Sequence, residues 1–276
     1  MKQKEYLIIE NGVADKQYWI NLWKFRELFY VLAWRDVAVR YKQTVLGILW
    51  ALMRPFLTMV VFTVIFGKIA KLDSDSQVPY SLMVFAGLLP WQFFSSALSD
   101  SSNSIVGNTN LINKVFFPRL IIPVSSIIVT FVDFFVSFSI LIVMMIWYSF
   151  LPSWHILFLP IFILMVFAAS LGPGLLLTTL NVKYRDFRYV IPFIVQIGLY
   201  ISPVGFGAAA IPEKWQLIYS LNPMVGIINA FRWSILGGDL LNIYQSLITS
   251  LIIIVFFLWI GICHFRKMEK SFADLI

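Results

Sequence analysis

Charge and cysteine are scarce in this chain. Only 13% of its 276 residues are charged, which is about half the share of an ordinary soluble domain, and 60% are hydrophobic. The one cysteine, Cys263, excludes an internal disulfide and any metal cluster made of cysteines alone. The composition therefore does not fit a soluble or a disulfide-stabilised secreted domain, and it points to lipid as the solvent.

Motifs for catalysis are also missing. The sequence contains no GxxxxGK[ST] phosphate loop, no HExxH zinc motif and no GxSxG nucleophile turn. Its two histidines, His155 and His264, fall at opposite membrane faces in the topology given below, so no shared metal site is expected. We therefore predict a chain that is not an enzyme, does not hydrolyse ATP itself and holds no metal or cofactor.

What the sequence does contain is six apolar runs, each near the roughly 20 residues that a membrane-spanning helix needs. The runs are continuous rather than alternating, which favours helices over barrel strands. We predict an all-α polytopic membrane protein with six transmembrane helices. The second run ends in a polar stretch, 95–104, which is expected to face protein or water. The predicted spans are 46–67, 80–105, 120–148, 156–180, 189–209 and 243–264.

The segment ahead of the first span is polar at first and then helical in pattern. Residues 1–17 are predicted to be flexible, and 18–45 to form an amphipathic helix. Its aromatic residues, including Trp23 and Trp34, fall on one stripe, and cations fall about a third of a turn away. Aromatics beside snorkelling cations suit a helix in the lipid headgroup layer. The alternative is an amphipathic helix packed on other protein.

The distribution of positive charge predicts the topology. With a cytoplasmic N-terminus, all but four of the 21 lysines and arginines fall on the cytoplasmic side. Such an excess marks the cytoplasmic face of bacterial and other membrane proteins. Both termini, including the tail 265–276, are therefore expected in the cytoplasm, with the six-span domain over 46–264. The four cations placed outside are Lys68, Lys71, Lys214 and Arg232.

The region 210–238, between the fifth and sixth spans, is broken by Pro212, Pro223 and a glycine pair into pieces too short to span. Its Phe, Trp and Ile content favours short re-entrant helices in the outer leaflet over a plain external loop.

Two charged residues fall inside predicted spans. Asp133 is an intramembrane carboxylate, which suggests a proton relay, a ligand contact or a structural pairing. No second buried acid or histidine is evident for a relay, so pairing is favoured. Arg54 precedes Pro55 about two turns into the first span. Its side chain either snorkels to the headgroups or faces an inner cavity that attracts an anion.

Two predicted cytoplasmic loops, 108–119 and 181–188, mix cations with exposed aromatic or aliphatic residues. This mixture favours docking of a soluble partner, with headgroup anchoring as the alternative. Aromatic residues inside the spans permit a pore lined by ring faces that stack on sugars. The pore candidates are Trp50, Phe56, Trp91 and Tyr200.

Several motifs, in order, resemble the membrane subunit of polysaccharide ABC exporters of the ABC-2 class, which export O-antigen, capsule and teichoic acid. The resemblance covers nearly the whole chain from about residue 20, and Gly205-Phe206-Gly207 departs from it. The motifs are Arg35 to Gly47 continuing to Arg54-Pro55, Phe85 to Trp91, Asn110-Leu111-Ile112 with Phe117-Pro118-Arg119, Tyr184-Arg185-Asp186, Ser202-Pro203-Val204 and Leu221-Asn222-Pro223-Met224.

The resemblance implies a homodimer in the bacterial inner membrane, bound to two separate ATPase chains that carry ATP and Mg. The cargo would be a polysaccharide, O-antigen foremost, on undecaprenyl diphosphate. It implies that the 108–118 and 181–188 loops are coupling helices in the ATPase clefts, with Asn110, Lys114, Phe117, Arg119, Lys183, Tyr184, Arg185 and Asp186 as contact candidates. The candidates for the gate and the lipid diphosphate are Arg35, Arg40, Lys42 and Arg54, and those for the outer re-entrant helices are Trp215, Asn222 and Pro223.

Three other functions compete with this one. The hypothesis of a drug or small-molecule exporter of the same class does not explain the aromatic helix ahead of the first span. A secondary transporter would need inverted repeats and several buried ionisable groups. A lipid-processing membrane enzyme would need clustered acids or histidines at one interface. Nucleic acid is not an expected partner, because the net charge of +7 is explained by cytoplasmic lysine and arginine.

Overall fold

The computed structural model describes residues 15–42, 47–70, 78–207, 211–238 and 243–272, and all regular structure in these ranges is helical. Residues 1–14 of the predicted flexible N-terminus and residues 273–276 of the predicted tail lie outside these ranges. The helices are α1 (Asp15–Lys24), α2 (Arg26–Lys42), α3 (Gly47–Phe62) with its π-helical extension η1 (Thr63–Ile69), α4 (Tyr80–Gly107), α5 (Thr109–Lys114), α6 (Ile121–Trp147), the 3₁₀ turn η2 (Trp154–Phe158), α7 (Leu159–Lys183), α8 (Phe187–Ile201), α9 (Glu213–Tyr219), α10 (Pro223–Leu236) and α11 (Tyr244–Glu269).

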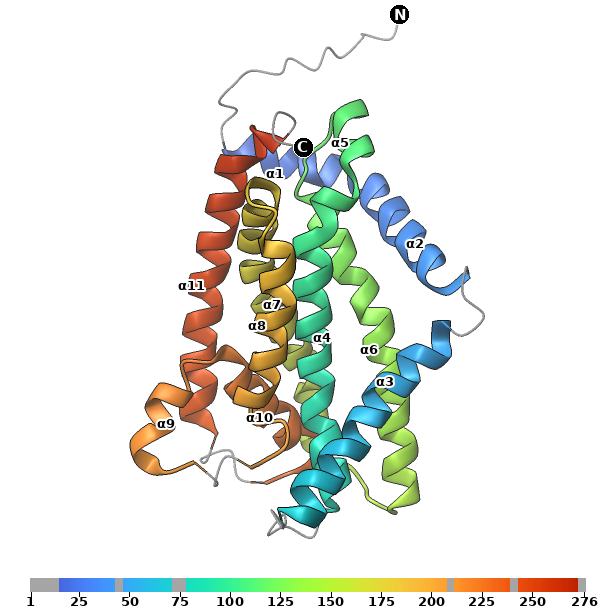
Figure 1. Ribbon diagram of the computed structural model, residues 1–276, viewed down its shortest axis with the longest axis vertical. Coiled ribbons are helices and arrows are strands. Elements are labelled where there is room, and N and C mark those ends of the chain that lie inside the picture. The colour runs from blue at the N-terminus through green and yellow to red at the C-terminus, as the bar shows by residue number, and fades with distance from the viewer. Residues whose placement is uncertain (1–14, 43–46, 71–77, 208–210, 239–242, 273–276) are drawn as a thin grey trace, which may run out of the picture.

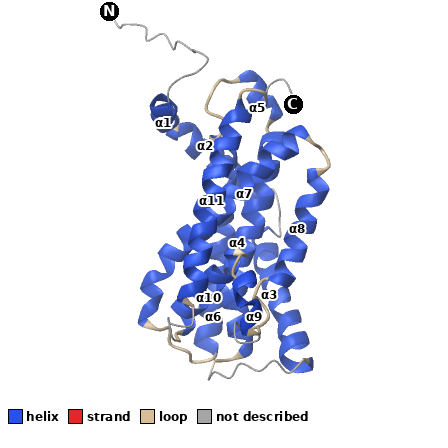
Figure 2. Ribbon diagram, turned by 90° about the vertical axis from the view of Figure 1, so that its left-hand side faces the viewer, coloured by secondary structure: helices blue, strands red, loops and turns tan. Residues whose placement is uncertain are grey.

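The helices form an elongated bundle with two distinct ends. Helices α1 and α5 and the last turn of α11 lie at one end, and α9 and α10 lie at the other (Figures 1 and 2). The described ends of the chain therefore meet at one end of the bundle. This arrangement is the one that two termini on the same side of a membrane require.

Five helical segments of the described chain are long and apolar enough to cross a membrane, and they match five of the predicted spans within a few residues. They are Leu49–Ile69, Tyr80–Gly107, Ile121–Trp147, Trp154–Lys183 and Tyr244–Glu269.

The predicted span 189–209 is shorter as a helix than the sequence suggested. Helix α8 has 15 residues, about 22 Å of rise, and the chain then leaves the helix at Ser202-Pro203. The segment still reaches the far end of the bundle, because Gly205 accepts a hydrogen bond from Tyr80 at the start of α4. A sixth crossing that is part helix and part extended chain fits this path, and the count of six spans stays a prediction.

Helix α4 is the centre of the bundle, since 67% of its most apolar 18-residue window is buried, against 17–33% in the other four segments. It packs against α6, α7 and α10. Its polar stretch is turned toward protein, as predicted: Ser101, Ser102 and Ser104 are buried. Thr178 and Asn181 of α7 donate to the carbonyls of Ser101 and Ser102, at 2.9 and 3.0 Å.

The segment ahead of the first span forms two helices rather than one. The chain turns at Phe25, between α1 and α2, and helix α1 already begins at Asp15. Helix α1 lies across the end of the bundle, whereas α2 descends alongside α6 (Figure 1). Trp23 and Trp34 are exposed, as a headgroup-facing stripe requires, but the membrane position of these helices stays a prediction.

The predicted short helices of 210–238 are α9 and α10. Asn222 and Pro223 explain why α10 begins where it does: the Asn222 side chain accepts from the Met224 N–H at 3.0 Å, and Pro223 occupies the first helical position. The Asn222 amide also donates to Ser202 at 3.0 Å, so the Leu221–Met224 and Ser202–Val204 motifs meet in space. Whether these helices re-enter the outer leaflet stays a prediction.

Candidate functional site

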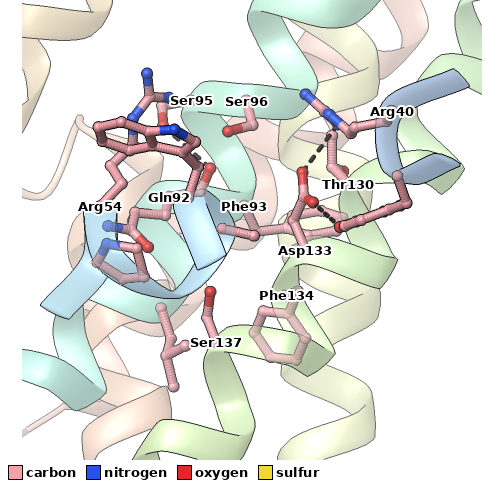
Figure 3. Close-up of a pocket in the computed structure, with 15 residues that line it drawn as sticks. Arg40, Arg54, Gln92, Phe93, Ser95, Ser96, Thr130, Asp133, Phe134 and Ser137 are labelled. Carbon is pink, nitrogen blue, oxygen red and sulfur yellow. Dashed lines mark hydrogen bonds and ion pairs between the residues drawn. The ribbon is translucent and has the colours of Figure 1, made fainter. Parts of the chain in front are cut away.

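Helices α2, α3, α4 and α6 line a partly open, charged cavity of about 390 Å³. Arg40 enters it from α2, Arg54 from α3 and Asp133 from α6, while Gln92, Ser95 and Ser96 line it from α4. Figure 3 shows the two arginines on opposite sides of the cavity, with the α4 serines between them. A cavity bordered by two guanidinium groups and several hydroxyls suits an anionic group with many oxygens.

Arg40 contacts two carboxylates. Its Nη1 lies 2.9 Å from Oδ2 of Asp133, and its Nη2 lies 3.2 Å from Oδ2 of Asp100. The neighbouring Tyr41 donates its hydroxyl to the other oxygen of Asp133. The end of α2 is therefore tied to α4 and to α6 by charged contacts.

The surroundings of Arg40 and Tyr41 favour the protonated form of both side chains. Burial disfavours the charge of Arg40, but Asp100 and Asp133 outweigh that effect, so the pKa of Arg40 lies above its ordinary value. The pKa of Tyr41 is also raised, by burial first and then by the hydrogen bond to Asp133. Arg40 therefore stays positive at neutral pH, and Tyr41 keeps its proton and acts as a donor.

The structure shows the surroundings of the two charged residues that fall inside predicted spans. Asp133 is in a structural pairing, as favoured, and its partners are Arg40 and Tyr41. The Arg54 side chain belongs to the lining of a cavity, which supports the second of its two alternatives. The sequence did not identify Asp100 as a partner of Arg40, because Asp100 lies in the serine-rich end of a span and belongs to no motif.

The other two gate candidates lie outside the lining of the cavity. Arg35, also on α2, contacts Asp36 at 2.7 Å and donates to Asn108 at 2.9 Å. Asn108 directly precedes α5, so Arg35 joins α2 to the predicted docking loop. Lys42, the last residue of α2, is exposed.

The 108–119 loop contains the short helix α5, as the resemblance implies, and Asn110 and Lys114 are exposed on it. Phe117 is not on its surface: that side chain is buried, and Val115 and Phe116 are exposed instead. The exposed aromatic side chain of this loop is therefore Phe116, the neighbour of the predicted contact residue Phe117.

Arg119 contacts the end of α11 through its main chain and through its side chain, which donates to the main-chain carbonyl of Glu269. Its main-chain N–H donates to Glu269 at the end of α11 at 2.6 Å, and Tyr18 of α1 donates to the same carboxylate at 3.0 Å. The loop after α5, helix α1 and helix α11 thus share one carboxylate.

The second predicted docking loop is a tight turn between α7 and α8, without a helix of its own. The four contact candidates in it are exposed: Lys183, Tyr184, Arg185 and Asp186.

The four pore candidates lie in different surroundings. Trp50 lines the charged cavity. Phe56 and Tyr200 are exposed, whereas Trp91 is buried in the core and its ring meets Gly198 of α8. Contact of these rings with a sugar stays a prediction.

At the opposite end of the bundle, Trp215 is exposed on α9. Arg232, one of the four cations predicted on the outer side, has a buried side chain. It donates to the carbonyls of Met83, Val204 and Phe206 at 3.1, 2.7 and 2.9 Å. Arg232 therefore joins α10 to α4 and to the chain after α8. Within the described residues, no group of three or more His, Cys, Asp or Glu side chains could hold a metal ion.

Comparisons with known proteins agree on one kind of molecule. The family model described as ABC-2 type transporter matches residues 27–236. The O-antigen export system permease protein RfbA of Klebsiella pneumoniae is 30% identical over 260 residues, covering 93% of this chain and 97% of the relative. A protein of the same name from Myxococcus xanthus is 26% identical over 258 residues, 93% and 98% of the two chains. The polysialic acid transport protein KpsM of Escherichia coli is 24% identical over 246 residues, 86% and 92%.

Proposed function

The chain belongs to the ABC-2 type transporter family, and on that premise we propose that it is the membrane subunit of an ATP-driven polysaccharide exporter. The relatives named above carry O-antigen or polysialic acid in their names, and they match nearly their whole length. O-antigen is the proposed cargo class, because the more similar relatives are O-antigen permeases.

The cargo is proposed to carry a lipid diphosphate, undecaprenyl diphosphate in bacteria. The observation that carries this part is the cavity with Arg40 and Arg54 on opposite sides (Figure 3). Two guanidinium groups provide paired, planar donors for phosphate oxygens, which a single lysine would not.

The assembly is proposed as two copies of this chain with two copies of a separate ATPase in the inner membrane, with both termini cytoplasmic. Helix α5 with the exposed Val115 and Phe116, and the turn Lys183–Asp186, lie at the end of the bundle that also holds α1 and the end of α11 (Figure 1). These exposed segments are the surface offered to the ATPase, which supplies ATP and Mg.

The proposal is tested in the native host. Deletion of the gene is expected to remove surface polysaccharide and to leave lipid-linked polysaccharide inside the cell, and the intact gene restores export. Arg40→Gln is expected to restore the protein level but not the export. A deletion strain with unchanged surface polysaccharide would contradict the proposed cargo class.

A further inference from the structure

Two carboxylates from different helices converge on one guanidinium in the cavity. Asp100 comes from α4 and Asp133 from α6, and each binds a different terminal nitrogen of Arg40. Oxygens on two nitrogens of one guanidinium are also the arrangement in which arginine binds phosphate. In this structure, the donors of Arg40 that would take a phosphate are thus directed at the protein's own anions.

Resting on the proposed function, we propose that Asp100 and Asp133 are stand-in anions, and that the diphosphate of the cargo displaces them from Arg40. Arg54 faces the same cavity from the other side and takes part of the incoming charge (Figure 3). Arg40, Arg54 and Asp133 line the cavity, whereas Asp100 reaches Arg40 from outside that lining.

Displacement is required because the anions compete for one site. A diphosphate on Arg40 would lie beside both carboxylates, and like charges about 4 Å apart repel strongly even in a partly polar protein environment. The Arg40–carboxylate contacts must therefore open as cargo binds. Since these contacts tie α2 to α4 and α6, binding releases the end of α2.

A movement of the end of α2 can be transmitted to α5, at the end of the bundle proposed to bind the ATPase. Arg35 lies five residues before Arg40 on the same helix, about 7.5 Å of rise, and donates to Asn108 next to α5. A rigid helix of that length passes a shift of Arg40 on to α5. Occupation of the cavity is thereby linked to the surface proposed to hold the ATPase.

The experiment measures binding of farnesyl diphosphate, with farnesol as the uncharged probe, to the full chain in lipid nanodiscs. Asp133→Asn keeps the shape of the side chain and removes its charge, and Asp100→Asn does the same on α4. Each variant is expected to bind farnesyl diphosphate at least about tenfold more tightly than the wild type. Glu27→Gln removes one charge from an exposed site on α2 and is expected to leave the affinity unchanged.

The outcomes separate the two proposals. If the wild type does not prefer farnesyl diphosphate to farnesol, or if Arg40→Gln keeps that preference, the diphosphate site itself is wrong and the displacement falls with it. If the preference depends on Arg40 but neither Asp133→Asn nor Asp100→Asn binds more tightly, only the displacement is overturned. Weaker binding by both folded variants would show that the carboxylates orient Arg40 for the ligand, which also overturns it.

Discussion

At the scale of single residues, the strength of the Arg40 contacts determines whether they can open. Arg40, Asp100 and Asp133 keep 37%, 34% and 25% of their side-chain surface exposed. Breaking a fully buried ion pair costs about 3–5 kcal/mol, and a surface pair contributes about 1 kcal/mol or less. Partly exposed pairs lie between these limits. They are strong enough to hold the end of α2 and weak enough for a diphosphate to displace.

Loss of the Arg232 side chain is expected to destabilise the fold. Arg232→Met removes the donors of three main-chain carbonyls, those of Met83, Val204 and Phe206. At about 1 kcal/mol for each lost hydrogen bond, the free energy of unfolding of the variant should fall by roughly 3 kcal/mol. Thermal unfolding in detergent measures the loss, and Arg26→Met at an exposed site of α2 is the matched control. Equal melting temperatures for the two variants would contradict the role of Arg232.

How far single residues could be predicted depended on whether their partners were local. A lone carboxylate in a span must be paired, so the pairing of Asp133 followed from the sequence. Its partner did not, because Arg40 reaches it only through the turn at Phe25 and the descent of α2 beside α6. The burial of Arg232 did not follow from the sequence either, because the carbonyls that it binds belong to residues far away along the chain.

At the scale of elements, the start of α10 is expected to depend on both the oxygen and the NH₂ group of the Asn222 side-chain amide. Asn222→Ala loses the N-cap and the bond to Ser202, and should cost about 1–2 kcal/mol. Asn222→Asp keeps an acceptor for the Met224 N–H and should cost less. Ser202→Ala isolates the second bond. Unfolding measurements that rank Asn222→Ala as no worse than Ser202→Ala would exclude the capping role.

The loop after α5 offers a test in two adjacent residues. Phe116 is exposed and Phe117 is buried, so Phe116→Ser should weaken copurification of the ATPase while the chain stays stable. Phe117→Ser should lower the melting temperature instead, because burying a serine in place of a packed ring costs about 3–5 kcal/mol, as for Phe→Ala. Affinity purification with a thermal scan measures both effects. The reverse pattern would place the docking surface elsewhere.

Elements with a long apolar run could be predicted well, since length and continuity are enough to define a spanning helix. Five of the predicted spans are confirmed in this sense. Helix α8 was less predictable, because Ser202-Pro203 ends the helix within an apolar run. Gly205 then allows close approach: a Cβ there would lie 2.7 Å from the Phe62 ring. The departure from the family pattern at 205–207 thus coincides with a tight contact.

At the scale of the whole molecule, the two ends of the bundle are expected on opposite sides of the membrane. Lys114 on α5 and Trp215 on α9 are exposed at opposite ends (Figure 1). In a Cys263→Ser background, an impermeant maleimide added to spheroplasts should label Trp215→Cys and spare Lys114→Cys. Labelling of both sites before lysis, or of Lys114→Cys alone, would refute the orientation inferred from positive charge.

Transport by the purified assembly tests the central claim most directly, that this chain forms the path and a separate ATPase drives it. Inverted proteoliposomes with both subunits, given lipid-linked polysaccharide outside and ATP, should take the polysaccharide into the lumen. Vesicles with this chain alone, or with both subunits and no ATP, should take up none. Uphill uptake by this chain alone, or no uptake by the complete assembly while it hydrolyses ATP, would contradict the account.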